Sequence, residues 1–421
     1  MLFTLEALPA SEGDCLLLHW GKKTSPKLAV IDGGPGQTYE KTLLKRLLQI
    51  RENRAVDQLD IAFAMVSHVD LDHITGVMKL FNVLKKEEEM QLPAGDRPLH
   101  VARLWHNTFN DILGDDADAY YQTLTASFQA SVDGKPNPTI VEKVEASLKA
   151  NDAEAPAETA YDIGLILAGH AEGRTLRDSQ AFLRKANLTS RLNSPFLKDD
   201  MPTLISSSRT PAPQDVDGLE VQVVGPLDDD IEKLQADFDV FIKDKKLSAE
   251  AMLAAYKDAS LPNLSSIVCV VGAGKRRILL TGDARGDKII EGLARAKITD
   301  LHFDVVKAPH HGSEHNLAPD FFKTITADSY VFSANGRFGN PDRPAVEWLI
   351  EARGKAAKYN IVLTYPVGKL DERRKKVAKT KWKESRDSLA VLFKERKAAG
   401  FKFKVVDDNR LIELGDSKIE W

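Results

Sequence analysis

The segment from Ile61 to His73 reads Ile-Ala-Phe-Ala-Met-Val-Ser-His-Val-Asp-Leu-Asp-His. Its first six residues form an apolar run that suits a buried strand, and a helical pattern follows. The polar residues in between are two imidazoles and two carboxylates: His68, Asp70, Asp72 and His73. These groups are ordinary ligands of zinc and of harder divalent ions. Their density at a strand end favours a metal-binding loop over the alternative, a polar turn with Asp72 as helix N-cap.

Composition is that of a soluble globular protein. The chain has 421 residues, of which 43% are hydrophobic and 29% charged, and its net charge is -4. Any affinity for nucleic acid must therefore come from a local basic patch. Cys15 and Cys269 each lie in an apolar run, which favours buried free thiols over a disulfide and fits a cytoplasmic location. Neither a signal peptide nor a membrane span is indicated.

Two distant segments, 13–34 and 263–283, share one plan. Each is typical of a β-hairpin whose second strand ends in an Asp beside Gly, and each is followed by a helical pattern and by a strand that leads to histidine. Two such halves that face each other would bring four residues to one sheet edge: Asp32, His68, Asp283 and His310.

The chain is expected to divide into four segments. Residues 1–106 and 216–368 are the two halves, and 107–215 is a helical insertion with helical patterns near 117–130, 140–150 and 160–187. The insertion is interpreted as a cap over the site or, alternatively, as a peripheral packing subdomain. A further helical stretch covers 228–258. Residues 369–421 are a basic extension that closes with a hairpin pattern at 401–406 and 410–414.

These motifs, in this order, resemble those of the metallo-β-lactamase-fold hydrolases. They are Ile-Asp-Gly-Gly at Asp32, the cluster from His68 to His73, Leu-Leu-Thr-Gly-Asp-Ala at Asp283 and His310-His311-Gly312-Ser313. The sequence is most similar to the metallo-hydrolase domain of ComEC-type DNA-uptake proteins, which also has a Gly-Asp turn as at Asp14 and an Asn-x-Ser motif as in Asn263-Leu264-Ser265-Ser266. The resemblance covers about 1–106 and 216–368. It implies an α/β fold of the αββα sandwich type, built from two similar halves, here with the helical insertion between them and the basic extension after them.

The resemblance also implies a site with two divalent metal ions, zinc or manganese. His68, Asp70 and one later residue would hold one ion, and Asp72 and His73 would hold the other with His310 or His311. Asp283 would bridge the ions. The predicted catalytic residues are Asp72, Asp283 and Lys307. Asp70 replaces the histidine usual in the family, which makes the site harder and favours manganese or a mixed site.

Further residues are expected around these ligands. Asp32 would orient a ligand histidine, and Asp14 and Ser266 would support the site or contact substrate. His106 either reaches the same edge or is an ordinary polar strand end. Lys307 and Ser313 flank the last histidines and could contact a substrate phosphate, the alternative for Lys307 being a solvated strand end.

The leading functional hypothesis is a phosphodiesterase or nuclease that uses a water activated by two metal ions on DNA or a nucleotide. It rests on the resemblance, on the hard acidic site and on the basic extension, in which Trp382 and Phe401 are interleaved with lysines and arginines. Alternatively, that extension is a solvated helix face with acidic partners. One alternative function is hydrolysis of a small ester or nucleotide signal. Another is a partner-dependent effector of a bacterial defence-type complex.

Overall fold

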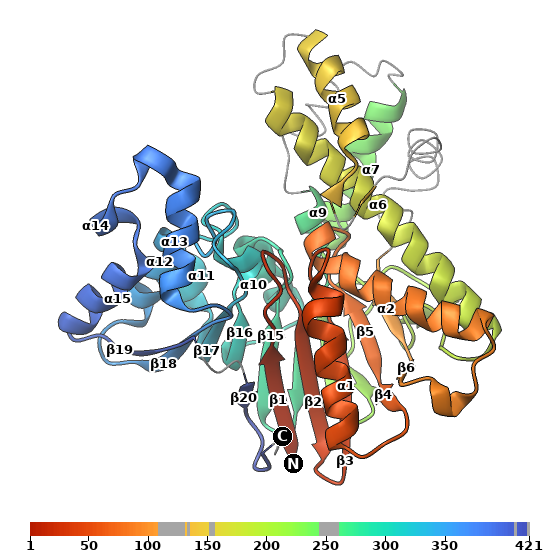
Figure 1. The fold of residues 1–421 in the computed structure, drawn as a ribbon. Helices are drawn as coiled ribbons and strands as arrows, with labels where there is room; N and C mark the ends of the chain where they lie inside the picture. Colours follow the sequence, from red (N-terminus) through yellow and green to blue (C-terminus); the bar gives the residue numbers. More distant parts are fainter. Residues whose placement is uncertain (108–130, 133–134, 151–155, 244–260, 408–410, 419–421) are drawn as a thin grey trace.

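Two mixed β-sheets form the centre of the computed structural model in Figure 1. The structure describes residues 1–107, 131–132, 135–150, 156–243, 261–407 and 411–418. Within them the chain has a mixed α/β fold with helices and several sheets, as the sequence predicts. No helix of these residues is long and apolar enough to cross a membrane.

The first sheet has six strands in the order β20-β1-β2-β3-β5-β7. Their bounds are β1 Leu2–Ala7, β2 Leu16–Lys22, β3 Ser25–Ile31, β5 Phe63–Val66, β7 Leu104–His106 and β20 Leu411–Glu413. The predicted hairpin of the first half is confirmed, because β2 and β3 pair antiparallel from Leu16 opposite Ile31 to Lys22 opposite Ser25. The predicted strand before His68 is β5, which lies parallel to β3.

The second sheet has eight strands, ordered from β12 to β19 as they follow in the chain. Their bounds are β12 Gln214–Val216, β13 Leu219–Gly225, β14 Val268–Ala273, β15 Arg276–Leu280, β16 His302–Lys307, β17 Thr326–Phe332, β18 Lys358–Leu363 and β19 Lys402–Val406. The second predicted hairpin is also confirmed, since β14 and β15 pair antiparallel. As in the first sheet, the strand after the hairpin (β16) continues the sheet in parallel, so the two sheets repeat one order of strands.

Apolar clusters show how the layers pack. One cluster joins the facing sides of the two sheets through residues such as Trp20 and Met65 from the first and Cys269 and Val305 from the second. The outer side of the first sheet packs on α1 (Leu44–Asn53), α2 (Leu71–Glu89) and α6 (Pro156–Lys185), and that of the second on α10 (Gly286–Arg295), α11 (Pro319–Thr324), α12 (Arg343–Arg353) and α15 (Leu389–Ala398). The order is therefore helices, sheet, sheet, helices. Both cysteines are free and buried, as predicted.

The predicted insertion contains α5 (Pro138–Ala150) and α6. In Figure 1, α5 lies above the sheets and α6 runs from there down along α2. Helix α6 packs along α2, and a Cβ added at Gly169 would stand 2.3 Å from the carbonyl oxygen of Val69. Because Gly169 has no side chain, α6 reaches the backbone of the loop that precedes α2. The predicted helix at 117–130 lies outside the described residues, and α7 (Asp228–Lys243) covers the described part of the predicted helix at 228–258. The cap interpretation stays a prediction.

Short elements connect these parts. They are the π-helix η1 (Tyr39–Leu43), η2 (Ala94–Asp96), η3 (Pro309–Gly312), η4 (Lys379–Lys381), α9 (Leu261–Leu264), α13 (Val367–Ala378), α14 (Glu384–Asp387), and the paired strands β4 (Leu59–Ile61) with β6 (Leu99–Val101), β8 (Ser131–Val132) with β9 (Lys135–Pro136), and β10 (Leu197–Lys198) with β11 (Met201–Pro202).

The hairpin predicted at the end of the chain is wrong. Strand β19 pairs parallel with β18 in the second sheet, whereas β20 pairs antiparallel with β1 in the first. Both segments are strands, as their alternating pattern indicates, but each completes the open edge of a different sheet. An isolated two-stranded hairpin is only marginally stable in water, whereas a strand at the edge of a larger sheet shares its packed hydrophobic face.

Candidate metal centre

Four strand ends meet at one edge of the two sheets. Asp32 follows β3, His68 follows β5, Asp283 follows β15 and His310 follows β16. The structure brings these halves together directly, since the amide of Ile267 donates to the carbonyl oxygen of Ser67 at 2.8 Å. The juxtaposition expected from the repeated plan is therefore present.

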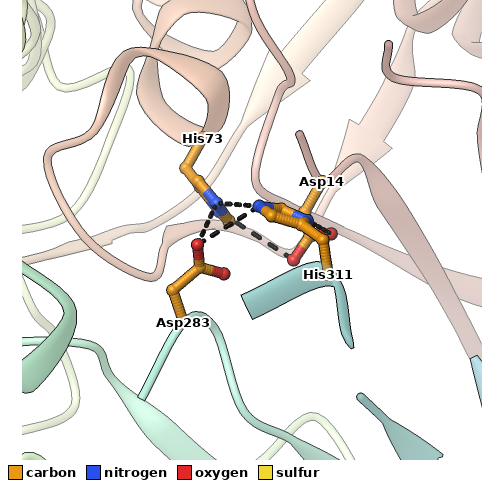
Figure 2. A group of neighbouring side chains, drawn as sticks. All are labelled: Asp14, His73, Asp283 and His311. Carbon is orange, nitrogen blue, oxygen red and sulfur yellow. Dashed lines mark hydrogen bonds and ion pairs between the residues drawn. The ribbon is translucent and has the colours of Figure 1, made fainter. Parts of the chain in front are cut away.

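Asp283 lies at the centre of a buried group of imidazoles, part of which is drawn in Figure 2. Its Oδ2 atom faces the Nε2 atoms of four histidines. The distances are 3.9 Å to His68, 3.3 Å to His73, 3.7 Å to His310 and 3.2 Å to His311. One carboxylate oxygen thus contacts groups from both halves of the chain, which is the position expected of a bridging ligand.

The remaining predicted ligands lie on two sides of Asp283. On one side the Nε2 atom of His68 is 3.4 Å from Oδ2 of Asp70. On the other side Asp72 Oδ2 is 3.3 Å from Nε2 of His311 and 3.9 Å from Nε2 of His73. Helix α2 begins after Asp70, whose side chain makes no capping hydrogen bond. Asp72 is therefore within the first turn, and the alternative of Asp72 as N-cap is wrong.

Each histidine is held on its Nδ1 side by a group outside this centre. Asp32 Oδ2 lies 2.9 Å from Nδ1 of His73, and the carbonyl oxygen of Ser333 lies 2.9 Å from Nδ1 of His311. The hydroxyl of Ser67 lies 3.1 Å from Nδ1 of His68, and Asn316 Oδ1 lies 2.7 Å from Nδ1 of His310. Partners on Nδ1 fix the orientation of the rings and leave Nε2 for the centre.

Asp32 also anchors the loop after β5. Its carboxylate accepts hydrogen bonds from the backbone amide of Ser67 at 2.7 Å and from the Ser67 hydroxyl at 2.8 Å. Its contact with His73 is the one predicted for it, and its orienting role stays a prediction. Ser67 stands in the opening motif but was not among the predicted site residues, because a serine before histidine carries no ligand signal of its own.

Asp14 and Lys307 form a buried ion pair beside the centre. Lys307 Nζ is 2.5 Å from Asp14 Oδ2, 3.4 Å from Asp283 Oδ1 and 2.9 Å from the carbonyl oxygen of Gly282. Lys307 is 1% exposed, so the alternative of a solvated strand end is wrong. Its three donors meet three acceptors, which leaves none for a substrate phosphate. A catalytic role for Lys307 stays a prediction, and it would act through Asp283.

Asp14, His73, Asp283 and His311 offer ligand atoms that all lie within 4.8 Å of one another (Figure 2). Asp14, however, contacts the Nδ1 atoms, at 3.2 Å for His311 and 3.9 Å for His73. An imidazole that offers Nε2 to one cation cannot offer Nδ1 to the same cation. We therefore expect Asp14 to support the two rings rather than to bind a cation, and this role stays a prediction.

The backbone at the two adjacent histidines is left-handed. His310 has φ 46° and His311 has φ 56°. Such angles cost free energy for residues with a Cβ and concentrate at functional sites. The amide of His310 donates to the carbonyl oxygen of Gly282 at 3.2 Å, which ties this turn to the loop of Asp283. His311 Nε2 lies 3.3 Å from both Asp72 Oδ2 and His73 Nε2, and the rings of His310 and His311 are 5.8 Å apart between centroids.

Electrostatics hold this set of side chains together. Burial alone would lower the pKa of His73, but the charges of Asp283 and Asp32 outweigh burial and raise it well above its usual range. Burial would also lower the pKa of His311, but the charges of Asp283 and Asp14 raise it well above its usual range. Burial likewise opposes ionisation of Asp283, but His311 and His73 lower its pKa well below the usual range. These shifts favour the protonated form of His73 and His311 and the ionised form of Asp283, so that a cation would enter there by displacing protons.

Two of the three further predicted residues, Ser266 and Ser313, lie near the centre, and His106 does not. The Ser266 hydroxyl accepts a hydrogen bond from the amide of Asp283 at 3.2 Å, and the Ser313 hydroxyl accepts one from the amide of His315 at 3.3 Å. His106 is fully buried at the end of β7 and contacts α6 instead, where a Cβ added at Gly173 would lie 3.4 Å from its Nε2. The structure does not bring His106 to the histidines around Asp283.

The basic run of the predicted C-terminal extension divides between surface and interior. Arg374 is buried and donates to the carbonyl oxygens of Gly339 and Asp387, and Arg373 stacks on Tyr365 with 5.4 Å to the ring centroid. Lys376 is exposed and pairs with Glu372 at 2.7 Å. Lys376 fits the interpretation as a solvated helix face, whereas the buried Arg374 does not, and contact of this run with a phosphate backbone stays a prediction.

Comparisons with known proteins add little. No protein-family model and no curated protein matches the sequence. Among solved structures, the chain is similar to a mutant of the CmlA beta-hydroxylase, with a TM-score of 0.34 and 10% sequence identity over 98% of this chain. The chain spans 54% of that neighbour. At this similarity the neighbour indicates nothing about chemistry, and the ComEC-type resemblance stays a hypothesis.

Proposed function

We propose that the chain is a metal-dependent hydrolase with a dinuclear centre, and that it cleaves phosphodiesters in DNA or a nucleotide. One observation carries the proposal. Four imidazole Nε2 atoms converge within 3.9 Å on a single oxygen of Asp283. Buried histidines and carboxylates gathered in this way are costly to desolvate, and such clusters concentrate at functional sites.

The residues present fit divalent cations. His68 is 1% exposed, and its Nε2 has no hydrogen-bond partner among the described residues although it faces Asp283. Every ring is fixed on Nδ1 and offers Nε2, as metal-binding histidines do. His68, Asp70 and His310 would hold one cation, and Asp72, His73 and His311 the other, with Asp283 between them.

Divalent cations held there would supply a water nucleophile at neutral pH and would polarise the oxygen of the bond under attack. The ligand set joins imidazoles to three carboxylates, Asp70, Asp72 and Asp283, which suits manganese as well as zinc. Hard cations favour phosphoryl oxygens, and this supports phosphodiesters over lactams as substrates.

The protein's own residues prepare this centre before any substrate arrives. Lys307 contacts Oδ1 of Asp283 and Asp14 contacts Lys307, so that Oδ1 is occupied and Oδ2 is left for the imidazoles. Burial alone would lower the pKa of Lys307, but Asp14 and Asp283 outweigh it and raise the pKa. The ammonium thus stays charged and offsets part of the negative charge of the carboxylates.

The proposal is tested with purified protein, metal analysis and three substrates: plasmid, single-stranded DNA and bis-(p-nitrophenyl) phosphate, each with Mn²⁺ or Zn²⁺. We expect bound transition metal and cleavage, both lost in Asp283→Asn. Asp287→Asn is the matched control, because Asp287 is an exposed carboxylate on α10 that pairs with Arg285. It should behave like the wild type.

Three results would count against the proposal. Absence of bound metal after gentle purification would remove its basis. Turnover of the small ester alone would favour a hydrolase of small esters or nucleotide signals. Intact metal without any cleavage would favour the partner-dependent effector.

A further inference from the structure

A cleft of about 630 Å³ is lined in part by the loops that follow β1 and β3. Its walls come from three parts of the chain that are distant in sequence: the loop after β1, residues 35–42 that lead into η1, and β9 with the start of α5. Arg337 and Tyr365 close it from the second half. This volume lies within the range of ligand-binding pockets.

The cleft is positively charged. Its ionisable residues are Lys41, Lys135, Arg337 and Glu12. Glu12 is neutralised, because Arg337 Nη1 lies 2.9 Å from its Oε1 and the side-chain amide of Asn335 donates to its Oε2 at 3.3 Å. Lys41 and Lys135 are exposed and have no ion pair in the part of the chain that the structure describes. Two lysines are thus available to an anion, and Arg337 retains further donors.

The same loops build the cleft and the metal centre. Glu12 stands two residues before Asp14, and Pro35, another lining residue, stands three residues after Asp32. Chain segments of that length span at most about 7 and 11 Å. The loop after β1 is also joined to the segment after β17, which leads to Arg337, since the Ser333 hydroxyl donates to the carbonyl oxygen of Gly13 at 2.8 Å. The cleft is therefore separated from Asp14 and Asp32 by no more than these lengths of chain.

An exposed aromatic ring lies beside Arg337, one of the residues that line the cleft. Phe338 is 59% exposed although it is fully apolar, and the guanidinium of Arg337 lies 5.3 Å from its ring centroid. The loop that carries both residues is held from below, because Arg374 donates to the carbonyl oxygen of Gly339 at 2.8 Å. An exposed ring beside cationic side chains is a common arrangement for binding a base and its phosphate together.

We propose that this cleft binds a second phosphate of the substrate, one that is not hydrolysed, in a single-stranded oligonucleotide. This rests on the proposed hydrolase function and adds that the enzyme selects substrates that extend beyond the scissile phosphate. Lys41, Lys135 and Arg337 contact the second phosphate, and Phe338 stacks on a neighbouring base.

Binding of a fluorescein-labelled hexadeoxynucleotide, measured by anisotropy in EDTA, tests the cleft without turnover. We expect Lys41→Ala, Lys135→Ala and Arg337→Gln each to raise Kd by about fivefold. Each should also lower the slope of log Kd against log salt by about 0.7. Lys275→Ala, an exposed lysine in the turn between β14 and β15, is the control and should bind like the wild type.

Kinetics separate this inference from the proposed function. The cleft variants should raise KM for the oligonucleotide and leave hydrolysis of bis-(p-nitrophenyl) phosphate, which has a single phosphate, unchanged. If the ester is hydrolysed but the cleft variants bind the oligonucleotide like Lys275→Ala, the cleft proposal is wrong and the hydrolase stands. If nothing is hydrolysed and binding still depends on the three cations, the hydrolase is wrong and the anion site stands. If tripolyphosphate displaces the labelled oligonucleotide and Phe338→Ala binds it like the wild type, the stacking of a base on Phe338 is wrong.

Discussion

His106 makes stability depend on pH in a way that can be calculated. Its ring is fully buried between β7 and α6, and both ring nitrogens lack a hydrogen-bond partner among the described residues. Burial, and then the charge of Arg177, lower its pKa to about 3. The unfolded chain would give it the ordinary value of about 6.5. The folded protein therefore keeps this imidazole neutral where the unfolded chain protonates it.

The sign and size of the effect follow from this difference. Between about pH 6.5 and pH 3 the unfolded state binds one more proton at this residue, so the free energy of unfolding falls as the pH falls. From about pH 7 to pH 5 the loss is about 2 kcal/mol. The substitution His106→Leu fills a similar volume without a titrating group, and it should abolish this part of the pH dependence.

The assay is urea unfolding of both proteins at about pH 7 and pH 5, followed by circular dichroism. Titration of all other groups, including the histidines around Asp283, is common to the two proteins and cancels in the difference. His106→Leu should gain about 2 kcal/mol relative to the wild type on going from about pH 7 to pH 5. Parallel behaviour of the two proteins would show that His106 is solvated or paired, and would refute its assignment as a neutral, unpartnered imidazole.

Three further substitutions or reactions probe the same structure. Lys307→Met should lower the free energy of unfolding by about 3–5 kcal/mol, because it leaves Asp14 buried without its cation. Urea unfolding measures this loss. A loss under about 1 kcal/mol would contradict the buried ion pair. Gly13→Ala places a Cβ 1.8 Å from the carbonyl oxygen of Asp72, so it should displace the start of α2 and lower the metal content measured by elemental analysis. Gly95→Ala is the control, because its added Cβ meets nothing within 4 Å, and it should leave the metal content unchanged. Cys15 and Cys269 should resist a thiol reagent in the native protein and react at once in urea. Burial raises the pKa of Cys15 well above its usual range and that of Cys269 to about 12. Fast reaction of the native protein would show that a thiol lies at the surface.

Local sequence patterns predicted the parts of the fold that depend on local physics. Both hairpins were predictable because alternation and Gly-rich turns specify neighbouring antiparallel strands. Asp32, His68 and Asp283 were predictable as neighbours because each ends a strand of one repeated plan. The two C-terminal strands were predicted as strands but assigned to the wrong partners, since periodicity identifies a strand and says nothing about which sheet edge is open.

Residues whose role depends on distant contacts could not be placed. Lys307 at the end of β16 looks the same in sequence whether water or Asp14 surrounds its ammonium, and only the folded chain brings Asp14 to it. His106 ends a strand of the first sheet as expected, yet a helix of the insertion covers it. Ser67 and the carbonyl of Ser333 hold ligand rings through hydrogen bonds that leave no mark on the sequence.

Strand β20 has a consequence for the behaviour of the chain in solution. All six residues of β1 are buried, and β20 occupies the backbone groups of β1 that β2 leaves free. A protein truncated before Leu411 would expose these N–H and C=O groups along an apolar edge, which is a template for pairing with another copy. The last residues thus protect the first strand from aggregation, although they lie far from it in sequence and beside it in Figure 1.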